Sequence, residues 1–233
     1  MKLLPDFIKN GYLKLIDPVA DWLVKKQVHP NTITVFGTLC TVIGGIIYAT
    51  GHIKTGGWFL SVTALFDVLD GTVARRSNRS STFGAFLDST LDRLADGFVL
   101  GGLAVFYATS QLHHSIPLMI TALLGLIGAF LTSYTRARAE ALGLDAKVGL
   151  LQRPERVVLM AAPQALFGLF FNGWPLAIII VVLTVTAWIT VVQRMVCVYT
   201  ATTRAEAAEA ETEARVRPRL FARRSPRPIL KGE

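Results

Sequence analysis

The chain has 233 residues, of which 52% are hydrophobic and 17% charged, and its mean hydropathy is +0.47. These values are too apolar for an ordinary soluble domain and exclude a disordered chain, so they predict a membrane protein. Both cysteines, Cys40 and Cys197, lie inside apolar runs, which excludes a disulfide-stapled secreted module. The net charge of +8 comes from basic residues between apolar runs, a pattern that indicates membrane orientation and not nucleic-acid binding.

Residues 1–26 carry apolar side chains at helical spacing, with lysines on the remaining surface. Leu4, Ile8, Leu15, Val19 and Trp22 follow the helical period. This pattern predicts an amphipathic juxtamembrane helix that lies at the inner face of a membrane. The segment has no continuous apolar run of the kind found in secretory signals.

Residues 27–203 contain six apolar stretches, each close to the roughly 20 residues that a transmembrane helix needs. The first covers residues 27–53, and the second begins at residue 55 and continues through two aspartates. Residues 97–135 and 157–193 each contain two passes, divided by polar turns at 111–117 and 172–175. The predicted fold class is an all-α membrane protein with six transmembrane helices and an N-terminal interfacial amphipathic helix.

Lysine and arginine gather on one side of these six spans. They lie in the N-terminal segment, in residues 75–83 and 136–156, and in the tail, whereas the opposite side has only Lys54. This asymmetry predicts that both termini are cytoplasmic. Residues 204–233 are rich in Ala, Glu, Arg and Pro, which predicts a polar, disordered cytoplasmic tail.

Four aspartates form the most informative pattern in the chain. Asp67 and Asp70 are three residues apart and Asp88 and Asp92 four apart, so on helices each pair shares a face. A short loop folds one pair against the other, and the carboxylates would repel unless cations neutralise them. Oxygen ligands favour Mg²⁺ or Mn²⁺, and four negative charges balance two divalent ions. Two metals with a carboxylate base suit displacement at phosphorus.

Residues 67–92 read D-x2-D-G-x2-A-R-x8-G-x3-D-x3-D, which resembles the signature of the CDP-alcohol phosphotransferases at every fixed position. The resemblance implies a bacterial inner-membrane enzyme, multi-pass and homodimeric, that transfers a substituted phosphate from a CDP-linked donor to an alcohol and releases CMP. It implies two Mg²⁺ ions, with Mn²⁺ as a possible replacement, held by Asp67, Asp70, Asp88 and Asp92, and Asp92 as the catalytic proton acceptor. The residues implied for CDP-diacylglycerol binding are Asn31, Thr34, Gly71, Ala74, Arg75, Ser81 and Gly84.

A group of arginines lies on the same side as the aspartates and suits an acceptor that itself carries a phosphate. The runs at residues 133–140, 153–156 and 192–194 resemble the bacterial phosphatidylinositol-phosphate synthases within the family, whose acceptor is inositol 1-phosphate. The residues implied for binding the acceptor phosphate are Ser133, Arg136, Arg153, Arg156 and Arg194. The product would be phosphatidylinositol phosphate.

Two alternatives stay open. A phosphatidylglycerophosphate synthase would take glycerol 3-phosphate, which also bears a phosphate, so charge does not separate the two acceptors. A divalent-cation transporter would also place carboxylates in the membrane. Transporters tend to show inverted repeats with sites at the midplane, whereas these aspartates occupy one edge and one half of the chain.

Overall fold

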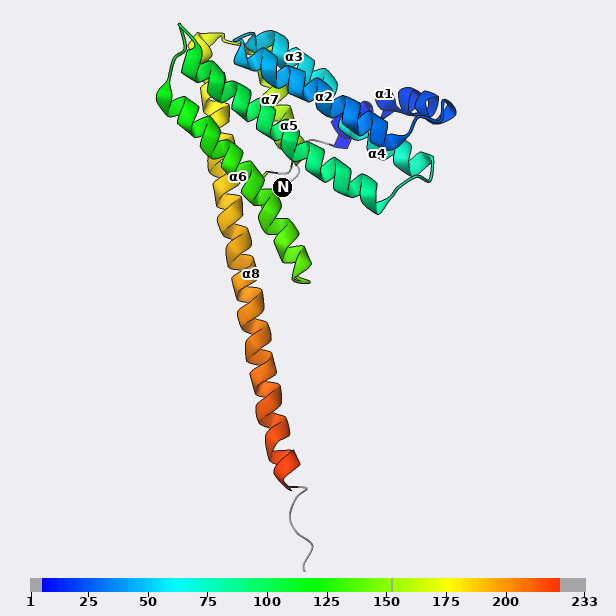
Figure 1. The fold of residues 1–233 in the computed structure, drawn as a ribbon, viewed down its shortest axis with the longest axis vertical. Coiled ribbons are helices and arrows are strands. Elements are labelled where there is room, and N and C mark those ends of the chain that lie inside the picture. Colours follow the sequence, from blue (N-terminus) through cyan, green and yellow to red (C-terminus); the bar gives the residue numbers. More distant parts are fainter. Residues whose placement is uncertain (1–5, 152, 223–233) are drawn as a thin grey trace, which may run out of the picture.

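The computed structural model describes residues 6–151 and 153–222 and, of these, the side chains of 16–151, 153–208 and 210. Every regular element in these residues is helical, which confirms the all-α prediction. The elements are α1 (Asp6–Lys25), α2 (Pro30–Ala49), α3 (Ile53–Thr63), α4 (Phe66–Arg76), α5 (Thr82–Thr109), α6 (Ile116–Ala141), α7 (Arg153–Phe167), the 3₁₀ turn η1 (Phe171–Gly173) and α8 (Trp174–Ala222). Figure 1 shows α2 to α7 packed together, with α8 running far beyond them.

Four helical stretches in the described residues are long and apolar enough to cross a membrane, as expected for a membrane protein. They are Pro30–Ala49, Ile53–Arg76, Ile116–Ala141 and Phe171–Ala208. The other two predicted spans correspond to α5, which has charged residues along its first half, and α7, which has only 15 residues. The structure therefore supports four candidate spans, and the count of six stays a prediction.

The connections lie where turn residues predicted them. Residues 110–115 separate α5 from α6, and positive φ angles of 53°, 55° and 75° at Phe171, Asn172 and Gly173 turn the chain into α8. The connections after α2, α5 and α7 meet at one end of the bundle, because Gly51 lies against Phe106 and Gly173 against His113. With α3 and α4 taken together as the one stretch Ile53–Arg76, the successive passes from α2 to α8 therefore alternate in direction.

Helix α1 packs on the helix that carries the first aspartate pair. Its buried residues Ile16 and Ala20 join a small apolar cluster with Leu69 and Val73 of α4. At the end of α4, Arg76 forms ion pairs with Asp17 and Asp21 of α1. Leu4, Ile8 and Leu15 lie outside the described side chains, and the position of α1 at a membrane interface stays a prediction.

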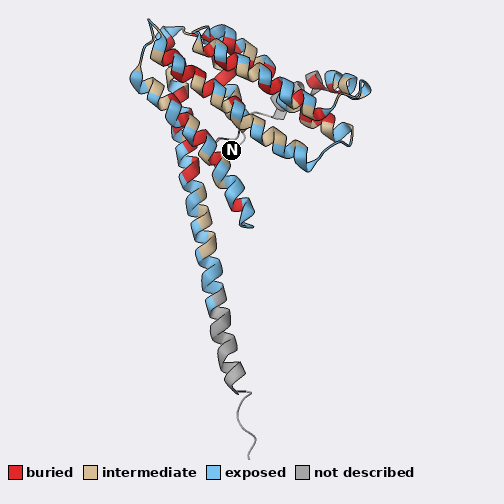
Figure 2. Ribbon diagram, in the orientation of Figure 1, coloured by how far each residue is buried: buried red, intermediate tan, exposed pale blue. Residues whose placement is uncertain are grey.

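Helix α8 differs from the expected tail. We expected residues 204–233 to be disordered, whereas α8 continues without a break to Ala222, and residues 223–233 lie outside the described part. Alanine, glutamate and arginine are strong helix formers, and this extension is rich in all three. A helix of 49 residues is about 74 Å long, and Figure 2 shows its described turns beyond the bundle as intermediate or exposed.

Helices α2 and α5 touch through their backbones. A Cβ atom at Gly102 would lie 2.1 Å from the carbonyl oxygen of Gly45, and one at Gly45 would lie 2.5 Å from that of Phe98. Such close approach needs small residues on both helices, as in many membrane bundles. Because α2 carries donor-site candidates and α5 carries Asp88 and Asp92, this contact fixes the spacing of the site.

We expect Gly102→Leu to disrupt the bundle, because the new side chain has no room against Gly45. The cost should be on the order of 1–3 kcal/mol or more, as for overpacked cores. Thermal unfolding and size-exclusion profiles in detergent would measure it. Gly101→Leu is the matched control, since a Cβ there meets nothing within 4 Å among the described atoms. Equal stability of the two variants would contradict the contact.

Candidate active site

The two aspartate pairs face each other across the turn between α4 and α5. The turn has Asn78 at φ 53°, and Ser81 caps α5 by accepting a hydrogen bond from the Gly84 amide at 3.0 Å. Asp70 interacts electrostatically with Asp88 and Asp67, and Asp92 interacts with the same two residues. The structure thus brings the four predicted carboxylates into one electrostatic cluster.

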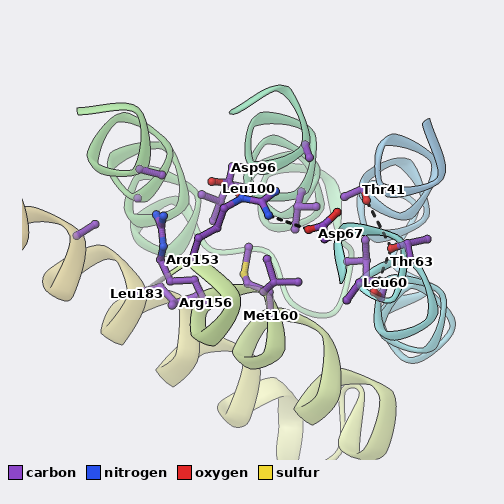
Figure 3. A pocket seen from close by; sticks show the side chains of 17 residues that line it. Thr41, Leu60, Thr63, Asp67, Asp96, Leu100, Arg153, Arg156, Met160 and Leu183 are labelled. Atoms are coloured by element: carbon purple, nitrogen blue, oxygen red, sulfur yellow. Dashed lines mark hydrogen bonds and ion pairs between the residues drawn. The ribbon is translucent and has the colours of Figure 1, made fainter. Parts of the chain in front are cut away.

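An arginine from a third helix lies between the pairs. Arg153, the first residue of α7, donates to Asp67 Oδ2 at 2.7 Å and to Asp92 Oδ1 at 2.6 Å. Figure 3 shows the Arg153 side chain reaching across to Asp67. Arg93 lies 3.8 Å from Asp92 Oδ2 and adds a second, more distant positive charge. The guanidinium of Arg153 therefore provides one positive charge, which two of the four carboxylates share.

Asp70 is stabilised differently, by hydrogen bonds from two uncharged groups. It is buried, with 7% of its surface exposed, and its Oδ2 accepts a hydrogen bond from Thr34 Oγ1 at 2.6 Å. The amide of Gly71 donates to its other oxygen. Thr34 belongs to the first turns of α2, so this bond attaches the predicted donor-site segment to α4.

The carboxylates suit a divalent cation in their chemistry. Their donor set contains only oxygen, which Mg²⁺ and Mn²⁺ prefer, and Asp67 and Asp92 already share one cation through Arg153. No three His, Cys, Asp or Glu side chains among the described residues are yet arranged to hold a metal ion. The oxygen donors are of the kind that binds a divalent cation, and in this structure the Arg153 guanidinium lies between two of the four carboxylates.

The predicted donor-site residues gather at the starts of α2 and α5 and along α4. A Cβ at Gly84 would lie 3.1 Å from Ser81 Oγ and 3.2 Å from Asn31 Oδ1, so these three residues form one cradle. On α4, a Cβ at Gly71 would lie 3.4 Å from Arg75 Nη1. Ala74 is half-buried on the same helix. A side chain at Gly84 would therefore crowd Ser81 and Asn31, and one at Gly71 would contact Arg75.

All five predicted acceptor residues line one cavity of about 450 Å³, which we call the basic cavity. Six basic side chains line it, together with two carboxylates: Arg93, Arg136, Lys147, Arg153, Arg156 and Arg194, with Asp92 and Asp96. Ser133 lines it from α6. The predicted proton acceptor Asp92 therefore lies in the wall of a positively charged cavity.

The arginines of the basic cavity are held in different ways. Arg194 donates to the carbonyl oxygens of Val148, at 3.0 Å, and of Thr132, which links the loop after α6 to α8. Arg136 pairs with Glu140 on its own helix at 2.9 Å. The buried Nε atom of Arg156 has no hydrogen-bond partner within the described part of the chain. Arg156 is thus well placed to bind an anion.

The sequence did not identify several residues of this site. Asp96, one turn after Asp92, lines the basic cavity and also a smaller, mainly apolar cavity of about 60 Å³ behind it (Figure 3). Its i+4 spacing was the available signal. Arg93 and Lys147 also line the basic cavity. Lys147 lies in an irregular loop, where no periodicity predicts which way a side chain points.

Comparisons with known proteins identify the family to which the sequence is similar. A sequence model of the CDP-alcohol phosphatidyltransferase family matches residues 27–198. The chain is 39% identical to the phosphatidylinositol phosphate synthase of Mycobacteroides abscessus over 193 residues, covering 82% of this chain and 87% of that protein. It is 38% identical to the archaetidylinositol phosphate synthase of Methanothermobacter thermautotrophicus over 186 residues, covering 80% and 89%.

Solved structures of a phosphatidylinositol phosphate synthase are similar to this chain in fold. The phosphatidylinositol phosphate synthase of Mycobacterium tuberculosis with CDP-DAG bound superposes with a TM-score of 0.73 at 34% identity, covering 80% of this chain and 94% of that one. The same enzyme in complex with manganese and citrate gives a TM-score of 0.72 at 34% identity, covering 79% and 89%.

We expect Thr34→Val to loosen the link between α2 and α4, because it leaves the buried Asp70 carboxylate without its hydroxyl donor. The loss should be about 1–3 kcal/mol in the free energy of unfolding. Thermal unfolding in EDTA would measure it. Thr38→Val, one turn further along α2, is the control, because the Thr38 hydroxyl donates only to the carbonyl of Thr34 on its own helix. An equal effect of both substitutions would argue against the Asp70 bond.

Proposed function

Because the chain belongs to the CDP-alcohol phosphatidyltransferase family, we propose that it transfers the phosphatidyl group of CDP-diacylglycerol to inositol 1-phosphate. The products are phosphatidylinositol phosphate and CMP. The observation that carries this proposal is the position of Asp92 in the wall of the basic cavity, beside the arginines that suit a phosphorylated acceptor. The names of both relatives above share inositol phosphate, and one solved structure contains CDP-DAG.

The donor is bound where α2, α4 and α5 meet. Gly71 and Gly84 leave space for the diphosphate to approach the backbone, and Asn31 and Ser81 offer polar groups beside it. Arg75 is exposed at the end of α4, where its charge attracts the anionic donor. Thr34 orients Asp70 through its hydrogen bond.

The acceptor enters from the basic cavity. Its phosphate pairs with Arg156, Arg194 and Arg136, and Arg153 and Ser133 complete the surroundings. This places the phosphate away from the aspartates and turns the inositol ring toward Asp92. An uncharged acceptor such as serine would leave most of these guanidinium groups without a partner.

Asp92 accepts the proton of the attacking inositol hydroxyl. Its side chain is only 14% exposed, so the proton transfer takes place largely out of contact with bulk solvent. The residues that would hold two Mg²⁺ ions, or Mn²⁺ in their place, are Asp67, Asp70, Asp88 and Asp92. The metals would supply charge neutralisation for the diphosphate and for the departing CMP.

We also propose six passes through a bacterial inner membrane, with both termini cytoplasmic and α1 at the interface. The charged half of α5 supports this, because Asp92 and Asp67 pair with Arg153 inside the bundle and need not face lipid. The distribution of lysine and arginine supports the orientation. A homodimer is part of the proposal and rests on the family resemblance alone.

CMP release by the purified protein in detergent tests the proposed reaction. We expect turnover with CDP-diacylglycerol, Mg²⁺ and inositol 1-phosphate, with little from glycerol 3-phosphate or serine. Asp92→Asn should lower the rate at least about 100-fold, as for loss of a general base, and EDTA should abolish it. Glu206→Gln, on the exposed part of α8, is the control.

Turnover with glycerol 3-phosphate alone would support the proposed catalytic site but contradict the proposed acceptor. The protein would then act as a phosphatidylglycerophosphate synthase. Absence of CMP with every acceptor, combined with Mn²⁺ flux into vesicles, would favour the transporter.

Arg156→Gln should raise the KM for inositol 1-phosphate about 10- to 100-fold, the usual range for a lost hydrogen bond to a charged group. The KM for CDP-diacylglycerol should change less than about twofold. Arg138→Gln is the control, because Arg138 is exposed on α6 and is not among the residues that line the basic cavity. Steady-state kinetics with each substrate varied in turn would measure both. Equal effects on the two KM values would place Arg156 outside the acceptor site.

A further inference from the structure

Arg153 belongs to two sites at once. Its guanidinium bridges Asp67 of α4 and Asp92 of α5 at 2.7 and 2.6 Å, and the same side chain lines the basic cavity. Arg156, three residues later on α7, lines the basic cavity too but forms no ion pair with these aspartates within the described residues. Arg153 is therefore the arginine that connects the carboxylate cluster with the acceptor site.

The bridging position of Arg153 disfavours a divalent cation held by the same carboxylates. The guanidinium nitrogens contact Asp67 Oδ2 and Asp92 Oδ1, one of the two potential metal-ligand oxygens of each carboxylate. A cation at those oxygens would lie within a few ångströms of the guanidinium, and like charges at that distance repel strongly in a poorly solvated site. Metal and Arg153 therefore compete for one position.

Arg153 has few bonds that would keep it there. Its described polar contacts in this position are the two carboxylates, and its buried Nε atom has no hydrogen-bond partner in the described part of the chain. The basic cavity of about 450 Å³ lies beside it and offers the displaced side chain a place to go. There it would join Arg136, Arg156 and Arg194 around an anion.

We propose that Arg153 is an exchangeable counter-cation that couples the two sites. Without metal, it neutralises Asp67 and Asp92. When a divalent cation takes these carboxylates, Arg153 turns into the basic cavity and adds a guanidinium for the acceptor phosphate. Metal binding thereby raises phosphate affinity, and phosphate raises metal affinity by the same factor, as linkage requires. The inference rests on the proposed function and adds to it a coupling between the metal and the acceptor phosphate.

Two binding measurements on the full-length protein in detergent test this coupling. Calorimetry with inorganic phosphate, with and without saturating Mg²⁺, gives the coupling factor, and the electron paramagnetic resonance signal of free Mn²⁺ gives metal affinity. For the unmodified chain we expect Mg²⁺ to tighten phosphate binding about tenfold, within the usual range of site coupling. No tightening would overturn the proposal.

Arg153→Gln tests whether Arg153 competes with the metal for the aspartates. In the absence of phosphate, this substitution should tighten Mn²⁺ binding about tenfold, because Arg153 no longer competes with the metal. It should also reduce the coupling factor between Mg²⁺ and phosphate to below about threefold. Unchanged Mn²⁺ affinity would show that Arg153 does not compete with metal. Tighter Mn²⁺ binding with unchanged phosphate affinity in the metal-loaded protein would show that Arg153 pairs with the aspartates but does not couple the metal site to the basic cavity. Either result overturns the proposal.

Two further variants serve as controls. Arg136 lines the same cavity but pairs with Glu140 and not with the aspartates. Arg136→Gln should therefore weaken phosphate binding and leave unchanged the Mn²⁺ affinity measured without phosphate. Arg153→Lys keeps one positive charge and should retain part of the coupling, which gives a second test if Arg153→Gln does not fold. Coupling between Mg²⁺ and phosphate binding, in a protein that releases no CMP when inositol 1-phosphate is the acceptor, would contradict the proposed acceptor. It would still support the role of Arg153.

Discussion

Negative charge concentrated inside an apolar helical bundle is the constraint on which the site depends. Asp67, Asp70, Asp88 and Asp92 lie within electrostatic range of one another, and such groups are costly in a membrane unless they are neutralised. In the structure, Arg153 bridges two of them and Thr34 donates a hydrogen bond to a third. The same need for positive charge makes the cluster a metal site in the proposed reaction and places cations beside the acceptor phosphate.

The surrounding helices hold this charge cluster in place. Backbone contact at Gly45 and Gly102 sets the distance between α2 and α5, and the ion pairs of Arg76 with α1 hold the end of α4. The loop after α6 is attached to α8 through Arg194 and closes the basic cavity. The donor-site candidates, the carboxylates and the basic cavity are therefore adjacent because α2, α4, α5, α6, α7 and α8 meet at one place.

Much of the fold and the family could be predicted from the sequence, because apolar runs, turn residues and the aspartate spacing are local signals. The family prediction from residues 67–92 is confirmed by the match over residues 27–198. The break between α3 and α4 was missed because residues 64–65 contain no proline or glycine, and the helical extension of α8 was missed because its polar composition, with Pro218, predicted disorder. The bridge made by Arg153 could not be predicted, because it joins residues 86 positions apart through tertiary packing. Lys147 was missed for a similar reason.

The central claim is that the four aspartates hold divalent metal beside the basic cavity and that Arg153 gives up its place there. Anomalous diffraction from crystals grown with Mn²⁺ and CDP-diacylglycerol tests it most directly. The account predicts manganese within about 2.5 Å of oxygens from both aspartate pairs, with the Arg153 side chain turned into the basic cavity. Manganese bound elsewhere, or Arg153 still bridging Asp67 and Asp92 beside a bound donor, would contradict it.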